Sequence, residues 1–100
     1  MMRNFRTFSI AVQFYREART LNIRGHLRDQ LSRASESIVL NLAEGRGKPT
    51  RKDQIRFFHI AMGSLRECQA ILVLSNSERT EAWNSLDTLA AHLFKLIARA

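Results

Sequence analysis

Apolar side chains recur at intervals of three and four residues along four stretches of the chain, which is the spacing of one helical face. The stretches cover about residues 5–21, 26–44, 51–74 and 78 onward, and short polar breaks separate them. Helices joined by short connections usually pack as antiparallel neighbours. The pattern therefore predicts an all-α fold, an antiparallel up-down-up-down four-helix bundle, in which residues 1–100 form a single domain.

The third stretch, from Arg51 to about Leu74, is apolar over much of its circumference. Such a helix is either central in its own bundle or covered by a second subunit, and both alternatives stay open. Gly63 interrupts this stretch without a turn following, and glycine inside a helix costs about 1 kcal/mol relative to alanine. We expect a neighbouring helix to approach closely at Gly63, because such an approach would compensate for the cost.

The break between the second and third stretches contains both a stop signal and a start signal. Gly45 and Gly47 are expected to take the left-handed conformation that closes a helix, and Pro49 cannot continue one. Thr50 stands where a helix N-cap belongs, with Asp53 three residues later as a shorter form of the capping-box acid. The sequence therefore predicts a tight basic turn that ends one helix and begins the next.

The charge is distributed unevenly along the chain. The sequence has 16 Lys and Arg against 9 Asp and Glu, a net charge of +7, and the whole excess falls in residues 1–56. Most of the basic residues are Arg, which suits bidentate contacts with phosphate better than Lys does. This distribution indicates a surface for nucleic acid or another polyanion, and a solvated basic face that only keeps the protein soluble is the alternative.

The basic turn and the helix that it opens are the predicted binding site. The nucleic-acid-binding residues expected there are Arg46, Lys48, Arg51, Lys52 and Arg56. Arg51 and Lys52 fall in the first turn of that helix, where cations oppose the helix dipole, so these two side chains are placed against local stability. The only aromatic residues nearby, Phe57 and Phe58, have the spacing of buried positions, so we expect phosphate contacts without base stacking. If the site lies elsewhere, the next group is Arg16, Arg19, Arg24 and Arg28.

No constellation of catalytic residues is recognisable. His26, His59 and His92 fall in three different helices, and no group of His, Cys, Asp or Glu has metal-ligand spacing. The lone Cys68 lies within an apolar helical pattern, which favours a buried, inert thiol over a reactive one. We therefore expect a protein that is not an enzyme and that has no catalytic residues, metal or cofactor.

The sequence also bears on the compartment. No apolar run approaches the roughly 20 residues that span a bilayer, and the first residues lack the apolar core of a signal peptide. The basic segments do not form one long amphipathic helix with an apolar face to spare, because that face is needed for the core. The expectation is a cytoplasmic protein without a membrane role.

Three segments resemble a known family. Arg33–Ile38, Asn41–Gly47 and Ile55–Glu67 are similar to the bacterial four-helix bundle proteins called 23S ribosomal RNA intervening-sequence proteins. Asn41, Glu44 and Gly45 correspond to the family's Asn-x-Ala-Glu-Gly. Asn41 and Glu44 are interpreted either as a site or, more readily, as residues that hold the turn through backbone groups. Many members have proline where this chain has Val39, so a proline kink in the second helix is not carried over.

The resemblance implies an assembly and a set of partners. Proteins of this family are open four-helix bundles that form ring-like homopentamers. They are similar in fold to the accessory variability protein of diversity-generating retroelements, a basic pentameric barrel that binds nucleic acid and partners a reverse transcriptase. The expected function is thus a non-enzymatic, homo-oligomeric binding or scaffolding module, pentameric by resemblance, for RNA or DNA and as an accessory to a reverse transcriptase. The alternative is a protein–protein interaction scaffold with no nucleic-acid role.

Overall fold

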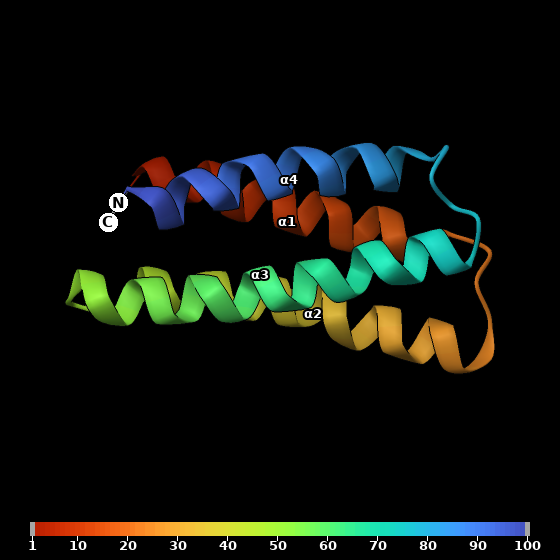
Figure 1. Cartoon of the computed structure of the whole chain (residues 1–100), viewed down its shortest axis with the longest axis horizontal. Coiled ribbons are helices and arrows are strands. Elements are labelled where there is room, and N and C mark those ends of the chain that lie inside the picture. Colours follow the sequence, from red (N-terminus) through yellow and green to blue (C-terminus); the bar gives the residue numbers. More distant parts are fainter. Residues whose placement is uncertain (1, 100) are drawn as a thin grey trace.

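The computed structural model of the chain describes residues 2–99, and their side chains from residue 6 onward. It contains the helices α1 (Met2–Arg19), α2 (Gly25–Arg46), α3 (Arg51–Leu74) and α4 (Glu81–Ala98), and no strand within the described residues (Figure 1). The predicted all-α fold is confirmed. The predicted bounds hold for α3 and differ by two or three residues at several other helix ends.

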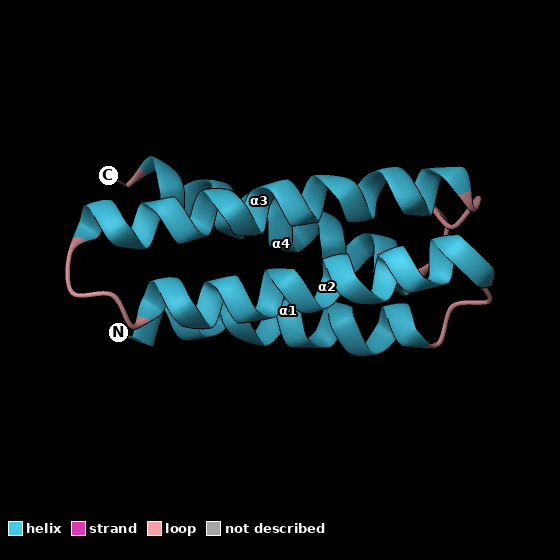
Figure 2. Cartoon of the chain, turned by 90° about the horizontal axis from the view of Figure 1, so that it is seen from below, coloured by secondary structure: helices cyan, strands magenta, loops and turns pink. Residues whose placement is uncertain are grey.

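The helices run up, down, up and down around one core. Each helix packs against two others, so that α1 touches α2 and α4, and α3 touches α2 and α4, with the α2–α3 contact the most extensive. The start of α1, the end of α4 and the α2–α3 turn lie at one end of the bundle, and the other two connections lie at the opposite end (Figures 1 and 2). The pairs α1–α2 and α3–α4 therefore form opposite sides of the molecule.

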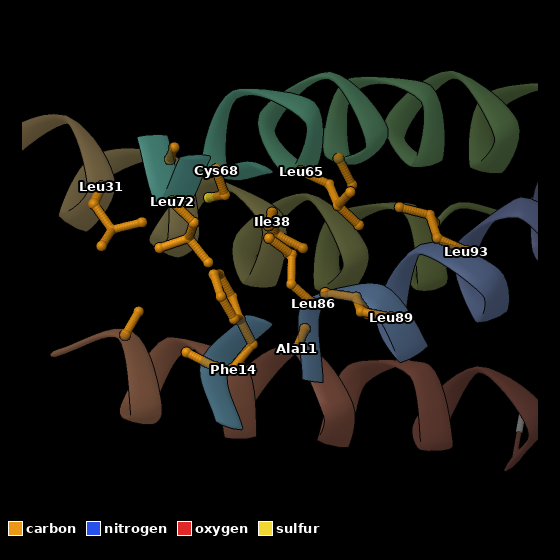
Figure 3. Packing of buried hydrophobic residues seen from close by; sticks show 14 of the residues in the cluster. Ala11, Phe14, Leu31, Ile38, Leu65, Cys68, Leu72, Leu86, Leu89 and Leu93 are labelled. Atoms are coloured by element: carbon orange, nitrogen blue, oxygen red, sulfur yellow. The ribbon is translucent and has the colours of Figure 1, made fainter. Parts of the chain in front are cut away.

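The core consists of the apolar stripes of all four helices. Figure 3 shows Phe14 reaching from α1 into the centre of the bundle toward Leu72 of α3. The largest fully buried apolar side chains are Phe14, Leu31, Ile38, Phe58, Leu65, Leu72, Leu86, Leu89 and Leu93. Smaller buried residues, such as Ala34 on α2 and Ala61 on α3, lie between them, and the full buried set recurs at three and four positions along each helix, as the sequence pattern predicts.

The start of α4 is later than expected. Thr80 is its N-cap, and the Thr80 hydroxyl accepts a hydrogen bond from the Trp83 N–H at 3.2 Å. Glu78 therefore lies in the preceding turn, and the prediction that it belongs to the first helical turn is wrong. Asn76 takes a positive φ of 57° in this connection, a conformation that asparagine adopts more readily than most residues. The connection is thus three residues longer than the predicted helix start at residue 78 implied.

The turn between α2 and α3 has the predicted N-cap but not the predicted glycine conformations. Thr50 is the expected N-cap, with its hydroxyl accepting from the Asp53 N–H at 3.2 Å. Gly47 closes α2 in the right-handed region, at φ −82° and ψ −7°, and Gly45 is a buried residue inside the helix. The prediction that Gly45 and Gly47 take left-handed conformations is therefore wrong.

Gly45 is present because two helices approach each other there. A Cβ atom at Gly45 would lie 2.8 Å from the Phe58 ring, 3.0 Å from the Phe57 Cβ atom and 3.1 Å from the Gln54 carbonyl oxygen. Gly63, by contrast, is exposed and has no atom within 4 Å of a built Cβ. No helix of the same chain approaches Gly63 closely, so that prediction is wrong, and the close approach lies at Gly45.

Arg28 has a structural role at the opposite end of the bundle. Its guanidinium donates hydrogen bonds to the carbonyls of Ala18 and Ile23, each at 3.0 Å, and to that of Leu21. These carbonyls lie at the end of α1 and in the connection after it, where the regular helical hydrogen bonding stops. Arg28 therefore joins α2 to the end of α1, and its charge is used within the fold.

By length and composition, α3 is long and apolar enough to cross a membrane, and it is the one such helix in residues 2–99. A core helix of a bundle passes the same test. Six of its residues are buried in the core, among them Phe58, Leu65 and Leu72. The apolar character of α3 is therefore a weak indication of a membrane span.

Candidate nucleic-acid interface

The five basic residues of the predicted site gather at one end of the bundle. Arg46 is the last residue of α2, Lys48 lies in the turn, and the other three lie within the first two turns of α3. Lys52 and Arg56 are exposed, whereas Arg46, Lys48 and Arg51 are half-buried. The structure thus brings the predicted residues together, and their local contacts divide them into two groups.

Arg51 connects α3 to α4. Its guanidinium donates a hydrogen bond to the carbonyl of Leu96, close to the end of α4. The contact joins the start of one helix to the end of another and gives Leu96 a cationic donor where helical N–H groups run out. Arg51 is therefore a structural residue first, which the sequence did not show because α3 and α4 are far apart along the chain at this point.

Lys48 is fixed by its surroundings. Its Nζ lies 3.2 Å from the Glu44 carboxylate, one helical turn earlier, and 5.1 Å from the centre of the Phe57 ring. The Gln54 side chain donates to the Lys48 carbonyl at 3.1 Å and so ties α3 to the turn. Lys48 keeps its charge at the surface in a restrained position, as a residue that contacts a ligand anion would require.

Phe57 is the feature that sequence reasoning missed. Phe58 is fully buried, but Phe57 is half-buried, with the Arg56 guanidinium 4.6 Å from its ring centre. Two of the predicted basic residues therefore lie over an aromatic ring at cation–π distance. The expectation that no accessible aromatic interleaves with these cations is wrong. The signal was available, since Phe57 lies beside the main apolar stripe of its helix and directly follows Arg56.

A sequence model of the family described as 23S rRNA-intervening sequence protein matches residues 5–99. The chain belongs to this family. No curated protein and no solved structure matches the chain. The match covers all four helices and so includes the basic turn and its surroundings.

The Asn-x-Ala-Glu-Gly segment of this 23S rRNA-intervening sequence protein serves the fold. The Asn41 amide donates to the Ser37 carbonyl at 2.9 Å and to the Ser37 hydroxyl at 3.1 Å, and that hydroxyl is 2.8 Å from the Ser64 hydroxyl of α3. Glu44 pairs with Lys48, and Gly45 admits α3. The contacts of Asn41 favour the interpretation that it stabilises the local structure, while Glu44 forms an ion pair with Lys48 of the basic turn.

The alternative basic group has three exposed members and one, Arg28, that bonds the backbone. Arg16, Arg19 and Arg24 are exposed, and Arg19 donates to the Tyr15 hydroxyl at 3.1 Å. Arg28 belongs to the cap at the end of α1. Among the described residues, no three or more His, Cys, Asp or Glu side chains lie where they could hold a metal ion. In the alternative group one cation, Arg19, lies over an aromatic ring, 5.6 Å from the centre of Tyr15, whereas at the basic turn two cations lie over the ring of Phe57.

Cys68 is buried in the core, and burial raises the pKa of its thiol from 9.0 to about 12, with a smaller contribution from the Glu67 carboxylate. Because the thiolate is the reactive form, we expect folded protein at about pH 8 to resist a thiol reagent that labels the urea-unfolded chain at once. The raised pKa also means that stability gained from the neutral thiol is present below pH 9 and is lost as the pH rises toward 12. Rapid labelling of folded protein would contradict this burial.

Proposed function

We propose that this 23S rRNA-intervening sequence protein is a non-enzymatic binding module of the cytoplasm that holds nucleic acid on its basic turn. The observation that carries the proposal is the cluster of the cations Lys48, Lys52 and Arg56 at one end of the bundle, in a chain with a net charge of +7. Backbone N–H groups at the start of α3 add donors for a phosphate. Contacts of this kind neutralise phosphates without reading bases, so the binding is salt-dependent and tolerant of sequence.

The test is a salt titration of binding to RNA and DNA, as single strands and as duplexes. Lys52→Glu/Arg56→Glu leaves Arg51 and its contact with Leu96 in place. Since each phosphate contact contributes roughly −0.7 to −0.9 to the slope of log K against log salt, the double variant is expected to flatten that slope by about 1–2. The matched control is Arg24→Glu/Arg79→Glu, which changes net charge equally at exposed positions in the two connections at the opposite end of the bundle.

The control is expected to bind much more like the wild type than the double variant does. An equal loss in both variants would mean that only net charge matters. No binding by the wild-type protein to any of the four nucleic acids would overturn the proposed function and would favour the alternative, a protein–protein scaffold. That alternative draws its support from the large apolar side chains that the single chain exposes, among them Leu74, 69% exposed, and Phe94, 64% exposed.

We further propose that the chain works as a homo-oligomer, and the support is an apolar surface on each of two opposite sides. On the α1–α2 side, Val12, Tyr15, Val39 and Leu40 line a hollow, and Leu40 is 59% exposed. On the other side α4 exposes Phe94, beside Ala90 and Ile97 at helical spacing. Two different faces that pack head to tail produce a closed ring when the rotation permits.

The number five comes from the family resemblance, and so does a reverse transcriptase as the partner of the ring. Light scattering at micromolar concentration tests the assembly. The expected mass is a multiple of the 11.5 kDa chain, and a monomer would overturn this part of the proposal. A ring would repeat the basic turn around its circumference, and such repetition multiplies weak single contacts through avidity.

A further inference from the structure

Phe57 is placed at the surface by a specific arrangement of α2 and α3. Gly45 lacks a side chain, so α3 comes close enough for the Phe58 ring and the Phe57 Cβ atom to lie against α2. The two neighbouring aromatic side chains then take different environments. Phe58 enters the core and is fully buried, whereas Phe57 stays at the edge of the helix pair and is half-buried. The Phe58 ring is thus part of the core, and the Phe57 ring is partly open to solvent.

The partly open ring is surrounded by positive charge that is itself held in place. Arg56 lies 4.6 Å and Lys48 lies 5.1 Å from the ring centre, and Glu44 holds Lys48 through an ion pair of 3.2 Å. Lys52, one turn before Arg56 on α3, is exposed. A partly buried aromatic ring does not need two cations in order to be stable, since each exposed cation–π contact contributes only a modest stabilisation.

We propose that Phe57, Arg56 and Lys48 form a stacking site for an unpaired base of single-stranded nucleic acid. Every base has a π-face that stacks on an aromatic ring or on a guanidinium plane, so a site of this kind accepts any base. Arg56 and Lys48 lie over the ring in the free protein, so they move aside to the phosphates on either side of the base as it stacks, and Lys52 contacts the next phosphate along the strand. Bases in a duplex already stack on one another, so this site favours single strands and loops over duplexes.

This inference rests on the proposed function, and it adds a preference that phosphate contacts alone do not give. Phosphate neutralisation attracts duplexes at least as well as single strands because a duplex carries more charge per unit length. A protein with the stacking site therefore loses single-strand binding selectively when the ring is replaced. A protein that uses only its cations loses nothing when Phe57 becomes an aliphatic residue of similar size.

The experiment measures the binding of the full chain to a labelled single strand of about 16 nucleotides and to a duplex of the same sequence. Phe57→Leu keeps an apolar side chain but removes the π-face, and Phe57→Trp enlarges that face. We expect Phe57→Leu to weaken single-strand binding about fivefold to 150-fold, the range that the loss of one stacked base gives, and to leave duplex binding unchanged. Melting curves show whether each variant is folded.

Phe57→Trp provides a direct signal. The wild type has a single tryptophan, Trp83 on α4, so a new tryptophan at position 57 reports on the site itself. We expect the single strand to quench the fluorescence of Phe57→Trp and to leave that of the wild type nearly unchanged, and we expect affinity to be kept or increased. Absence of quenching in the bound variant would overturn the stacking site.

The remaining outcomes separate the two claims. If Phe57→Leu binds single strand and duplex as the wild type does, or loses both equally, the stacking site is wrong and the proposed nucleic-acid function stands. If the wild type binds neither nucleic acid, the proposed function fails and the stacking site fails with it. A selective loss of single-strand binding in Phe57→Leu, with binding kept in Phe57→Trp, would support both the stacking site and the proposed function.

Discussion

Gly45→Ala is expected to lower the free energy of unfolding by about 1–3 kcal/mol, the usual cost of forcing one extra carbon into a packed interior. The new Cβ atom would lie 2.8 Å from the Phe58 ring, which is fully buried and has no room to move, and 3.1 Å from the Gln54 carbonyl oxygen of the backbone. The helices α2 and α3 must therefore separate at the turn. Urea unfolding followed by circular dichroism, at fixed protein concentration, measures the effect.

The same substitution at Gly63 is the matched control and should have the opposite sign. Gly63 is also inside a helix, but a Cβ atom there meets nothing within 4 Å. Helix propensity alone then favours alanine over glycine by about 1 kcal/mol. A destabilising Gly63→Ala would show that another subunit covers this position, and equal effects at the two glycines would contradict the close approach at Gly45.

Phe14→Ala is expected to lower the free energy of unfolding by about 3–5 kcal/mol, because it empties the place of a large side chain in the centre of the bundle. Phe14 is 0% exposed, and it reaches from α1 toward Leu72 of α3 (Figure 3). The total stability of a small domain is about 5–15 kcal/mol, so the loss is a large share of it. Thermal and urea unfolding both measure it.

Phe94→Ala is the matched control for Phe14→Ala. Phe94 is 64% exposed on α4, so its truncation should change the stability of the single chain by no more than about 0.5 kcal/mol. If the α4 side packs against another copy, the same variant lowers the mass seen by light scattering at low protein concentration. A loss of stability as large as that of Phe14→Ala, without any change in mass, would contradict the exposed position of Phe94.

The family segment at the end of α2, residues 41–45, affects both the stability of the turn and the positions of side chains near it. Asn41 bonds the Ser37 carbonyl within α2, Glu44 restrains Lys48, and Gly45 makes room for α3. Each of these contacts stabilises the turn or sets the position of a side chain around Phe57. The segment therefore links the stability of the α2–α3 pair to the geometry of the proposed binding surface.

The sequence alone determined the architecture of this protein. Spacing of apolar residues at three and four positions predicted four helices, and the polar breaks with Pro49 and Thr50 predicted where α3 begins. Both signals are local, because helical periodicity and N-caps depend on residues within one or two turns of each other. The segments from Arg33 to Glu67 also indicated the family that the match over residues 5–99 then established.

Only the tertiary structure decided what individual residues do at the basic turn. The sequence suggested a helix-closing role for Gly45 and a close helix approach at Gly63, but α3 approaches α2 at Gly45, and Gly63 is exposed. Arg51 is one of five clustered cations until α4 brings the Leu96 carbonyl to it, and Phe57 is separated from the buried Phe58 by its position at the edge of the α2–α3 contact. These roles depend on which helix faces which, and this is set by packing between residues far apart in the chain, which local periodicity does not encode.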